Sequence, residues 1–217
     1  MKLETQFYSE QQACLPEGGK QILAQYDEKS IIVYQAYKTS IAAYASSHQA
    51  FGGSEYSFNR MSWIKPNFLW MMYRSGWAAK PGQEAILAIR IRRAHFEQIL
   101  AGAVHSSFKP DVYQTQANWQ HAMDSSDIRL QWDPDHNPFG AKLERRAIQL
   151  GLKGETLKRF AIDWILEIED ITPFVADQRR WLDSREVHKL VVPKERIYPV
   201  EDEKLQNKLR LTKETIL

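Results

Sequence analysis

A block of basic and aromatic residues between Arg60 and Arg93 carries the most specific chemistry in this sequence. The block holds seven basic residues and one acidic residue, so its net charge is +6, against +2 for the whole chain. Aromatic rings interleave with its first half. A flat aromatic ring stacks on a base or on nicotinamide, and arginine donates paired hydrogen bonds to phosphate oxygens. The block therefore favours a site for a nucleotide or for nucleic acid.

Three cations of this block are expected to bind phosphate groups, and two rings are expected to lie beside the ligand. The cations are Arg60, Lys65 and Arg74, and the rings are Trp63 and Tyr73. The alternative is a core helix with its cations in solvent. The tryptophans of the block recur every seven residues, which would place them on one face of such a helix.

A second candidate lies at the polar end of the apolar run that begins at Ile31. Gln35 stands there among aromatic residues, and a buried glutamine needs hydrogen-bond partners. Its amide offers a donor and an acceptor, which match a carboxamide or the edge of a base. We expect Gln35, with Tyr34 and Tyr37, to contact such a group of a bound ligand. An amide satisfied in the core, or at a strand edge, is the alternative.

A third candidate is the segment that begins with Gln131. A strand over 127–132 would deliver Gln131 and Asp133 to one side. We expect Asp133 to act as a general base or to stabilise a developing positive charge. The alternative is a turn carboxylate that caps backbone N–H groups. Asp133, Asp135 and His136 could also ligate a metal, but Asx and Pro residues are typical of a polar turn, and we expect no metal.

Other chemistries lack their sequence signals. The phosphate-binding loop, the dinucleotide glycine loop, the nucleophile elbow and the paired-histidine zinc motif are absent. Cys14 is the only cysteine, which excludes an intramolecular disulfide and a cysteine-rich zinc site. The first residues carry an early acid and no continuous apolar core, so we expect no signal peptide there, and no apolar run approaches the roughly 18 residues of a membrane span. A cytoplasmic protein without a membrane partner is expected.

The elements that must position these residues mix strands and helices without a regular alternation, which predicts an α+β fold. We expect a single domain over 21–184, with a mixed or antiparallel sheet and several packed helices. Expected strands cover 22–26, 30–37, 85–92, 127–132, 146–150 and 165–171, and expected helices cover 40–49, 66–76, 95–104, 155–164 and a segment from Thr172. Residues 105–126 predict a long surface loop. Residues 1–20 predict an N-terminal arm, and 185–217 a charged tail that packs only in part.

Several stretches together resemble the family called domain of unknown function 4291. They are Ile32 to Tyr37, Arg60 to Pro66, Phe68 to Trp77, Gln131 to Pro134 and Ile148 to Leu152. The resemblance covers about residues 20–183. It implies a single-domain protein to which no activity is assigned.

The order of elements also resembles ADP-ribosyltransferase-like domains. In those domains an early strand ends in a nicotinamide-binding motif and a late strand presents Glu or Gln. Gln35 stands near the position of the expected His or Arg, and Gln131 or Asp133 near that of the late acid. The late Glu is missing from that strand, although Glu167 and Glu169 lie on a later one.

The leading hypothesis is a nucleotide-binding protein that binds NAD and transfers ADP-ribose to an unknown acceptor. Gln35, Gln131 and Asp133 would be catalytic. The alternative is a non-catalytic RNA- or DNA-binding module that uses the basic and aromatic face of residues 60–93. A third reading is an interaction protein whose tryptophans all lie in the core. The sequence gives neither the acceptor nor the oligomeric state.

Overall fold

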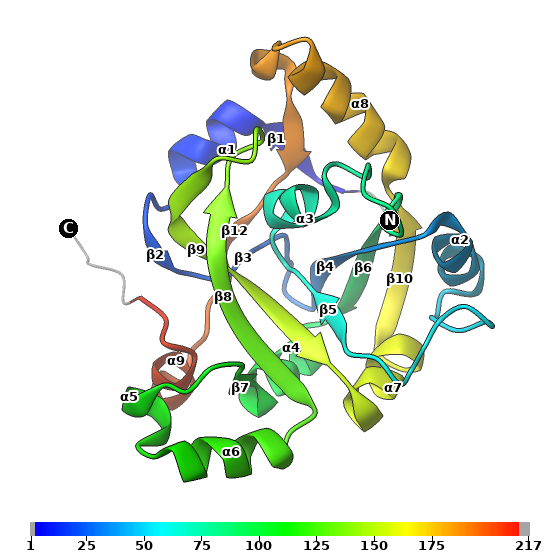
Figure 1. Ribbon diagram of the computed structural model, residues 1–217. Helices are drawn as coiled ribbons and strands as arrows, with labels where there is room; N and C mark the ends of the chain where they lie inside the picture. The colour runs from blue at the N-terminus through cyan, green and yellow to red at the C-terminus, as the bar shows by residue number, and fades with distance from the viewer. Residues whose placement is uncertain (1–2, 213–217) are drawn as a thin grey trace.

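Two sheets carry the fold, and their longest strands follow the apolar runs of the sequence. In the computed structural model, which describes residues 3–212, β4 (Ser30–Tyr37) pairs antiparallel with β6 (Ala85–Arg92) over eight residues (Figure 1). β10 (Ile165–Asp170) pairs antiparallel with the other side of β6. The strands β4 and β6 have the bounds expected from sequence. The mixture of these strands with packed helices confirms the α+β class.

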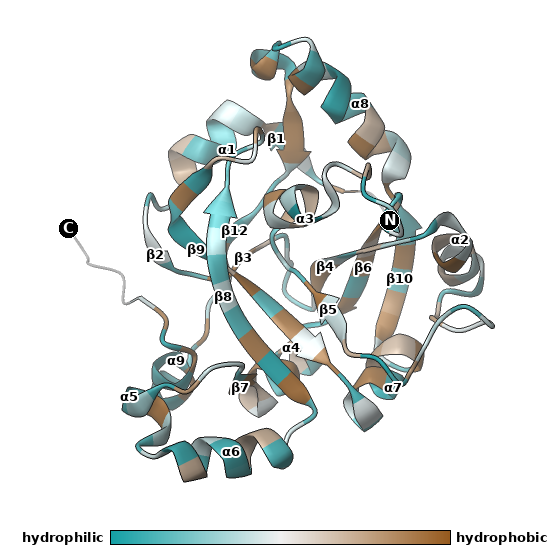
Figure 2. Cartoon of the chain, viewed as in Figure 1, coloured by the Kyte–Doolittle hydropathy of each residue, from teal (hydrophilic) through white to brown (hydrophobic). Residues whose placement is uncertain are grey.

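The second sheet has the order β2-β9-β8-β7. The strands in this order are β2 (Gly19–Lys20), β9 (Lys142–Leu152), β8 (Ile128–His136) and β7 (Val104–His105), and a fifth strand, β5 (Ser62–Ile64), pairs with β9 outside it. β8 and β9 are antiparallel, whereas the short pairs β2·β9 and β7·β8 are parallel. Figure 2 shows hydrophilic and hydrophobic residues alternating along part of β8, as a strand with two different faces requires.

A short segment joins the two sheets. β5 (Ser62–Ile64) pairs antiparallel with the end of β9. The next residue, Lys65, forms a backbone bridge with Tyr34 in β4, in which Tyr34 N donates to Lys65 O at 2.7 Å. Residues 62–65 therefore touch both sheets, and side chains from this segment lie where the sheets approach each other.

The strand β4 is covered on both faces, as its continuous apolar run indicates. Ile31 and Val33 belong to the larger hydrophobic core, whereas Ile32 and Tyr34 belong to a second core under α3 (Phe68–Ser75). Further helices pack around these cores. They are α2 (Thr39–His48), α4 (Arg93–Gly102), α7 (Gly154–Ile162) and α8 (Thr172–Asp183).

The helix α3 begins two residues after Pro66 because Asn67 caps it. The Asn67 side chain accepts a hydrogen bond from Trp70 N at 2.7 Å. Gly76 ends the helix in the left-handed region, with φ of 60°. Only Trp70 of the three evenly spaced tryptophans lies in this helix, so the three do not form one helical face. Trp63 lies in β5, and Trp77 follows the end of α3.

Two local predictions differ from the structure. Residues 105–126 hold α5 (Pro110–Tyr113) and α6 (Gln116–Asp124) instead of a continuous loop. No residue of α6 is buried. The helix therefore needs no apolar face, and the sequence carries no apolar periodicity that would predict it. β8 also continues through Pro134 to His136 instead of ending in a turn. β7 covers β8 only at Arg129 and Leu130, so Pro134 lies on an open edge where its missing N–H is tolerated.

The chain ends are more fully packed than expected. β1 (Thr5–Phe7) pairs with β11 (Val191–Pro193), and β3 (Leu23–Ala24) pairs with β12 (Arg196–Ile197). The remaining elements of these regions are α1 (Tyr8–Cys14), the 3-10 helix η1 (Val187–Lys189) and α9 (Glu203–Leu209). Leu190, Val192, Tyr198 and Leu209 are buried. The residues up to Thr212 are thus no solvated tail, since isolated apolar residues among the charges find partners far away in the sequence.

Candidate functional site

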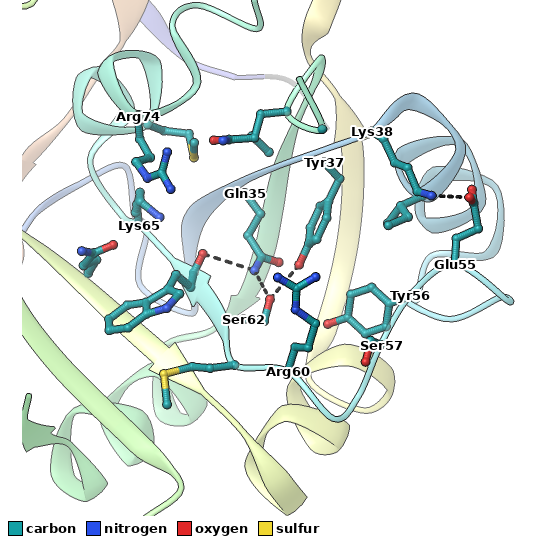
Figure 3. A pocket seen from close by; sticks show the side chains of 18 of the residues that line it. Gln35, Tyr37, Lys38, Glu55, Tyr56, Ser57, Arg60, Ser62, Lys65 and Arg74 are labelled. Atoms are coloured by element: carbon teal, nitrogen blue, oxygen red, sulfur yellow. Dashed lines mark hydrogen bonds and ion pairs between the residues drawn. The ribbon is translucent and has the colours of Figure 1, made fainter. Parts of the chain in front are cut away.

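A cavity of about 690 Å³ lies at the junction of the two sheets. Its wall is built from the end of β4, the segment that leads into β5, one side of α3, and the facing strands β8 and β9 (Figure 3). A volume of this size is typical of a small-molecule site. Among residues 3–212, no group of three or more metal-ligating side chains is placed to hold a metal ion.

Most of the residues predicted for the site line this one cavity. They are Gln35, Tyr37, Arg60, Trp63, Lys65, Arg74 and Gln131. They come from β4, β5, α3, β8 and the adjoining connections, and they lie up to about a hundred positions apart in the sequence. The fold therefore brings the three sequence candidates to one place. Tyr34, Tyr73 and Asp133 do not line the cavity.

Tyr34 lies on the opposite face of β4 from Gln35. Neighbouring side chains of a strand point to opposite faces, and the Tyr34 side chain points away from the cavity that Gln35 lines. Tyr34 is fully buried against Phe68, and burial raises the pKa of its hydroxyl well above the usual value. Its role is in the second core.

Tyr73 points away from the cavity although its neighbour Arg74 lines it. Successive helical residues point about 100° apart around the axis, which explains the difference. The Tyr73 ring stacks on the ring of His136, and their centroids are 3.4 Å apart. The stack continues to Trp70, which is buried.

Asp133 is two residues from Gln131 in β8 and on the same face of the strand, although it does not line the cavity. Its carboxylate accepts hydrogen bonds from Gln131 Nε2 at 2.9 Å and from Gln149 Nε2 at 2.7 Å. Both glutamines line the cavity, and they face each other across the β8·β9 pair. Asp133 thus fixes two amide groups of the wall. Its neighbour Asp135 is buried in an ion pair with Arg145, whose Nε donates at 2.6 Å.

A hydrogen-bonded group connects Gln35, Ser62 and Tyr37. Gln35 Nε2 donates to Ser62 Oγ at 2.7 Å and to Trp63 O at 3.3 Å, and the Tyr37 hydroxyl lies 2.7 Å from Ser62 Oγ. Figure 3 shows these contacts on one wall. Burial raises the pKa of Tyr37 well above its usual value, so its hydroxyl stays protonated. The buried Gln35 Oε1 accepts no hydrogen bond from residues 3–212 and remains available to a donor on a ligand.

Within residues 3–212, three of the four cations that line the cavity form no ion pair, whereas the fourth, Lys38, is paired with Glu55. The three are Arg60, Lys65 and Arg74. Lys65 is 4% exposed, and its pKa is lowered to about 7. Burial is the main cause, the positive charge of Arg74 adds to it, and Asp133 opposes it. Figure 3 shows the amino group of Lys65 beside the Arg74 side chain.

The remaining cations of the basic block lie elsewhere. Tyr37 pairs with Ala85 and Ser30 with Arg92, so Arg92 is at the end of β6 away from the cavity. Arg90 forms an ion pair with Asp27 near that end, and Lys80 donates to carbonyl groups at the end of α3. The block is continuous in sequence but divided in space.

Some wall residues escaped the sequence analysis. Ser62 gives no signal by itself because serine is common in turns and strands. Gln149, however, stands in an apolar strand as Gln35 does, and the same argument could have found it. Glu55 lines the cavity and is held by Lys38 and Ser40, a contact that depends on how the start of α2 meets the loop that carries Glu55.

Comparison with family models matches residues 21–198 to the domain of unknown function (DUF4291). The chain belongs to this family. All residues that line the 690 Å³ cavity lie within the part of the chain that matches the DUF4291 family model. A search of curated proteins finds no match to the chain. Within residues 3–212, no helix combines the length and the apolar character that crossing a bilayer requires.

Proposed function

We propose that the cavity binds a nucleotide through its phosphates, with NAD as the first ligand to test. The observation that carries this proposal is a set of three cations on the wall of one cavity, Arg60, Lys65 and Arg74, which form no ion pair with any residue from 3 to 212. Like charges that lie close together repel one another, and an anion bound between them offsets that repulsion. Phosphate oxygens supply that anion and accept charge-assisted hydrogen bonds from guanidinium groups.

The polar wall suits the nicotinamide end of NAD. Gln35 Oε1 is buried without a hydrogen-bond donor, and the carboxamide of nicotinamide would supply one. The Trp63 ring lines the cavity nearby and offers a flat surface for stacking. An anion with an attached carboxamide therefore matches both parts of the wall.

The proposed reaction breaks the bond between nicotinamide and ribose. Nicotinamide leaves with the bonding electrons, and positive charge develops on the ribose carbon until an acceptor nucleophile attacks it. The amide nitrogens of Gln131 and Gln149 donate to Asp133, which leaves their carbonyl oxygens available to the ligand. Fixed carbonyl dipoles stabilise a positive charge that develops in the transition state. Asp133 would accordingly act as a positioning residue.

Isothermal titration with NAD, ADP-ribose and ATP tests the binding step. We expect Arg60→Gln and Arg74→Gln each to weaken binding about tenfold or more, because each removes a charge-assisted hydrogen bond. Arg92→Gln is the matched control, since Arg92 is exposed and lies at the far end of β6. Absence of binding by the parent protein to all three ligands would reject the proposal.

The alternative is a non-catalytic RNA- or DNA-binding module on residues 60–93. That module predicts that Arg92→Gln weakens oligonucleotide binding as strongly as Arg60→Gln does, since both belong to the same face. The separation of Arg92 from the cavity favours the nucleotide site.

A further inference from the structure

A second group of cations lies outside the 690 Å³ cavity, near Gln131. Lys20, Lys109, Arg146 and Arg210 surround two depressions of about 460 Å³ and 230 Å³. Lys20 and Arg146 line both depressions, so the two adjoin. We call these four residues the second basic cluster.

The fold assembles this cluster from four distant segments. Lys20 and Arg146 are paired residues of the parallel strands β2 and β9. Lys109 directly precedes α5, and Arg210 directly follows α9. Figure 1 shows α5, α6 and α9 gathered near β7 at this end of the molecule. The sequence gives no basic run here, because the charges converge only on folding.

The cluster has an excess of positive charge. Burial lowers the pKa of Lys20, and the positive charges of Arg210, Lys109 and Arg146 lower it further. Of the two carboxylates in the larger depression, Asp111 is paired with Arg210 at 2.8 Å, and Glu144 is the other. Within residues 3–212, no ion pair involves Lys20, Lys109 or Arg146. Three cations thus remain for a ligand.

The smaller depression shares a wall with the candidate site. Gln131 lines both this depression and the 690 Å³ cavity. Trp132 also lines the smaller depression, and its ring is fixed because Nε1 donates to Leu209 O at 2.9 Å. A molecule held by the cluster would therefore reach the same glutamine that a nucleotide in the cavity contacts.

We propose that the second basic cluster binds the phosphate backbone of a polynucleotide, which is the acceptor for the group held in the cavity. Several cations spread over two adjoining depressions match a chain of phosphates better than a single phosphate. The Trp132 ring can stack a base, as in other single-strand binding grooves. The acceptor role rests on the proposed function, whereas backbone binding does not.

In the proposed transfer, NAD donates its ADP-ribose group to the polynucleotide. A nitrogen or oxygen atom of the polynucleotide forms a bond to the ribose carbon, and the nicotinamide–ribose bond breaks. Nicotinamide departs with the electron pair, and the proton of the attacking group passes to solvent.

Fluorescence anisotropy with labelled single-stranded DNA and RNA of about 12 nucleotides tests backbone binding in the absence of NAD. The double variant Lys109→Gln/Arg146→Gln should bind about tenfold or more weakly, with a shallower dependence on salt. The control Lys158→Gln/Arg180→Gln removes the same charge from exposed helical ion pairs and should bind as the parent does. A parent that binds neither strand, or a double variant that matches the control, overturns the proposal.

Two further measurements separate the two halves of the proposal. Titration with NAD should give the same affinity for the parent and the double variant. Circular dichroism shows whether the double variant is folded. If the double variant is unfolded, Lys109→Gln and Arg146→Gln are measured singly, and each should lower oligonucleotide affinity. Labelled NAD should then transfer label to the oligonucleotide only with the parent cluster. Oligonucleotide binding without transfer removes the acceptor role and keeps backbone binding, whereas failure to bind NAD removes the proposed function.

Discussion

Lys65 and Arg74 share one wall of the cavity, and the charge of the arginine adds to the effect of burial on the lysine. The pKa of Lys65 is consequently about 7, so at neutral pH its amino group is about half protonated. A bound anion favours the protonated amine. Lys65 therefore links ligand binding to proton uptake.

Nucleotide binding should depend on pH through Lys65. An anionic ligand raises the pKa of this amine, so affinity is greatest below about pH 7 and falls as pH rises through the free-state pKa. Calorimetry at about pH 8 in buffers of different ionisation enthalpy should detect proton uptake. Lys65→Met should show none at the same pH, whereas equal uptake in both proteins would exclude Lys65 as its source.

Removal of the Lys65 charge should stabilise the fold. Its folded pKa of about 7 is below its ordinary value, so between these values the unfolded chain binds more protons. Stability should thus rise with pH over this range in the parent. Lys65→Met should raise the free energy of unfolding at about pH 6.5 by about 1 kcal/mol or more. Urea denaturation should show the difference between the two proteins shrinking towards about pH 9.5, and a constant difference would contradict this account.

Asp133→Asn should impair turnover more than binding. An asparagine oxygen can accept from one glutamine amide, but its NH₂ group cannot accept from the other, so the Gln131 and Gln149 amides lose their common orientation. We expect nicotinamide release from NAD to fall about 100-fold with little change in NAD affinity. Asp163→Asn, at an exposed helix end, is the control and should be fully active. An Asp133→Asn protein as active as this control would remove Asp133 from the mechanism.

The buried pair of Asp135 and Arg145 should be sensitive to loss of one partner. The two side chains are 1% and 2% exposed, so Arg145→Met leaves an unpaired buried carboxylate. The free energy of unfolding should fall by about 3–5 kcal/mol. The double variant Asp135→Asn/Arg145→Met removes both charges and should recover part of this loss. Denaturation of the two variants and the parent gives the comparison, and equal stability of both variants would show that charge pairing is not the cause.

The sequence predicted the parts of the fold that depend on continuous apolar runs. β4 and β6 have their expected bounds because each run is buried and flanked by polar residues. β8 was cut short because Pro134 is tolerated only on an edge, and which strand forms an edge depends on the whole sheet. The chain ends were missed because β1 and β11 pair across nearly the whole sequence, which local patterns do not report.

Most, but not all, of the residues predicted for the site line the cavity. The local excess of positive charge with interleaved aromatic rings indicates Arg60 and Lys65, and an amide within an apolar run indicates Gln35, since a buried amide needs partners. Tyr34 was wrongly grouped with Gln35, although their adjacency in a strand already excludes a shared face. Tyr73 could be separated from Arg74 only once the direction of α3 relative to the sheets was known.

Residues 62–65 both join the two sheets and form part of the cavity wall. A motion that separates the sheets here breaks either the pairing of β5 with β9 or the backbone pairing of Tyr34 with Lys65, and either change deforms the cavity. A ligand that contacts this wall therefore stabilises the contact between the two sheets. Hydrogen exchange of the Tyr34 and Lys65 amides should then report whether the cavity is occupied. Their exchange with solvent should slow when a ligand stabilises the backbone hydrogen bonds between these two residues.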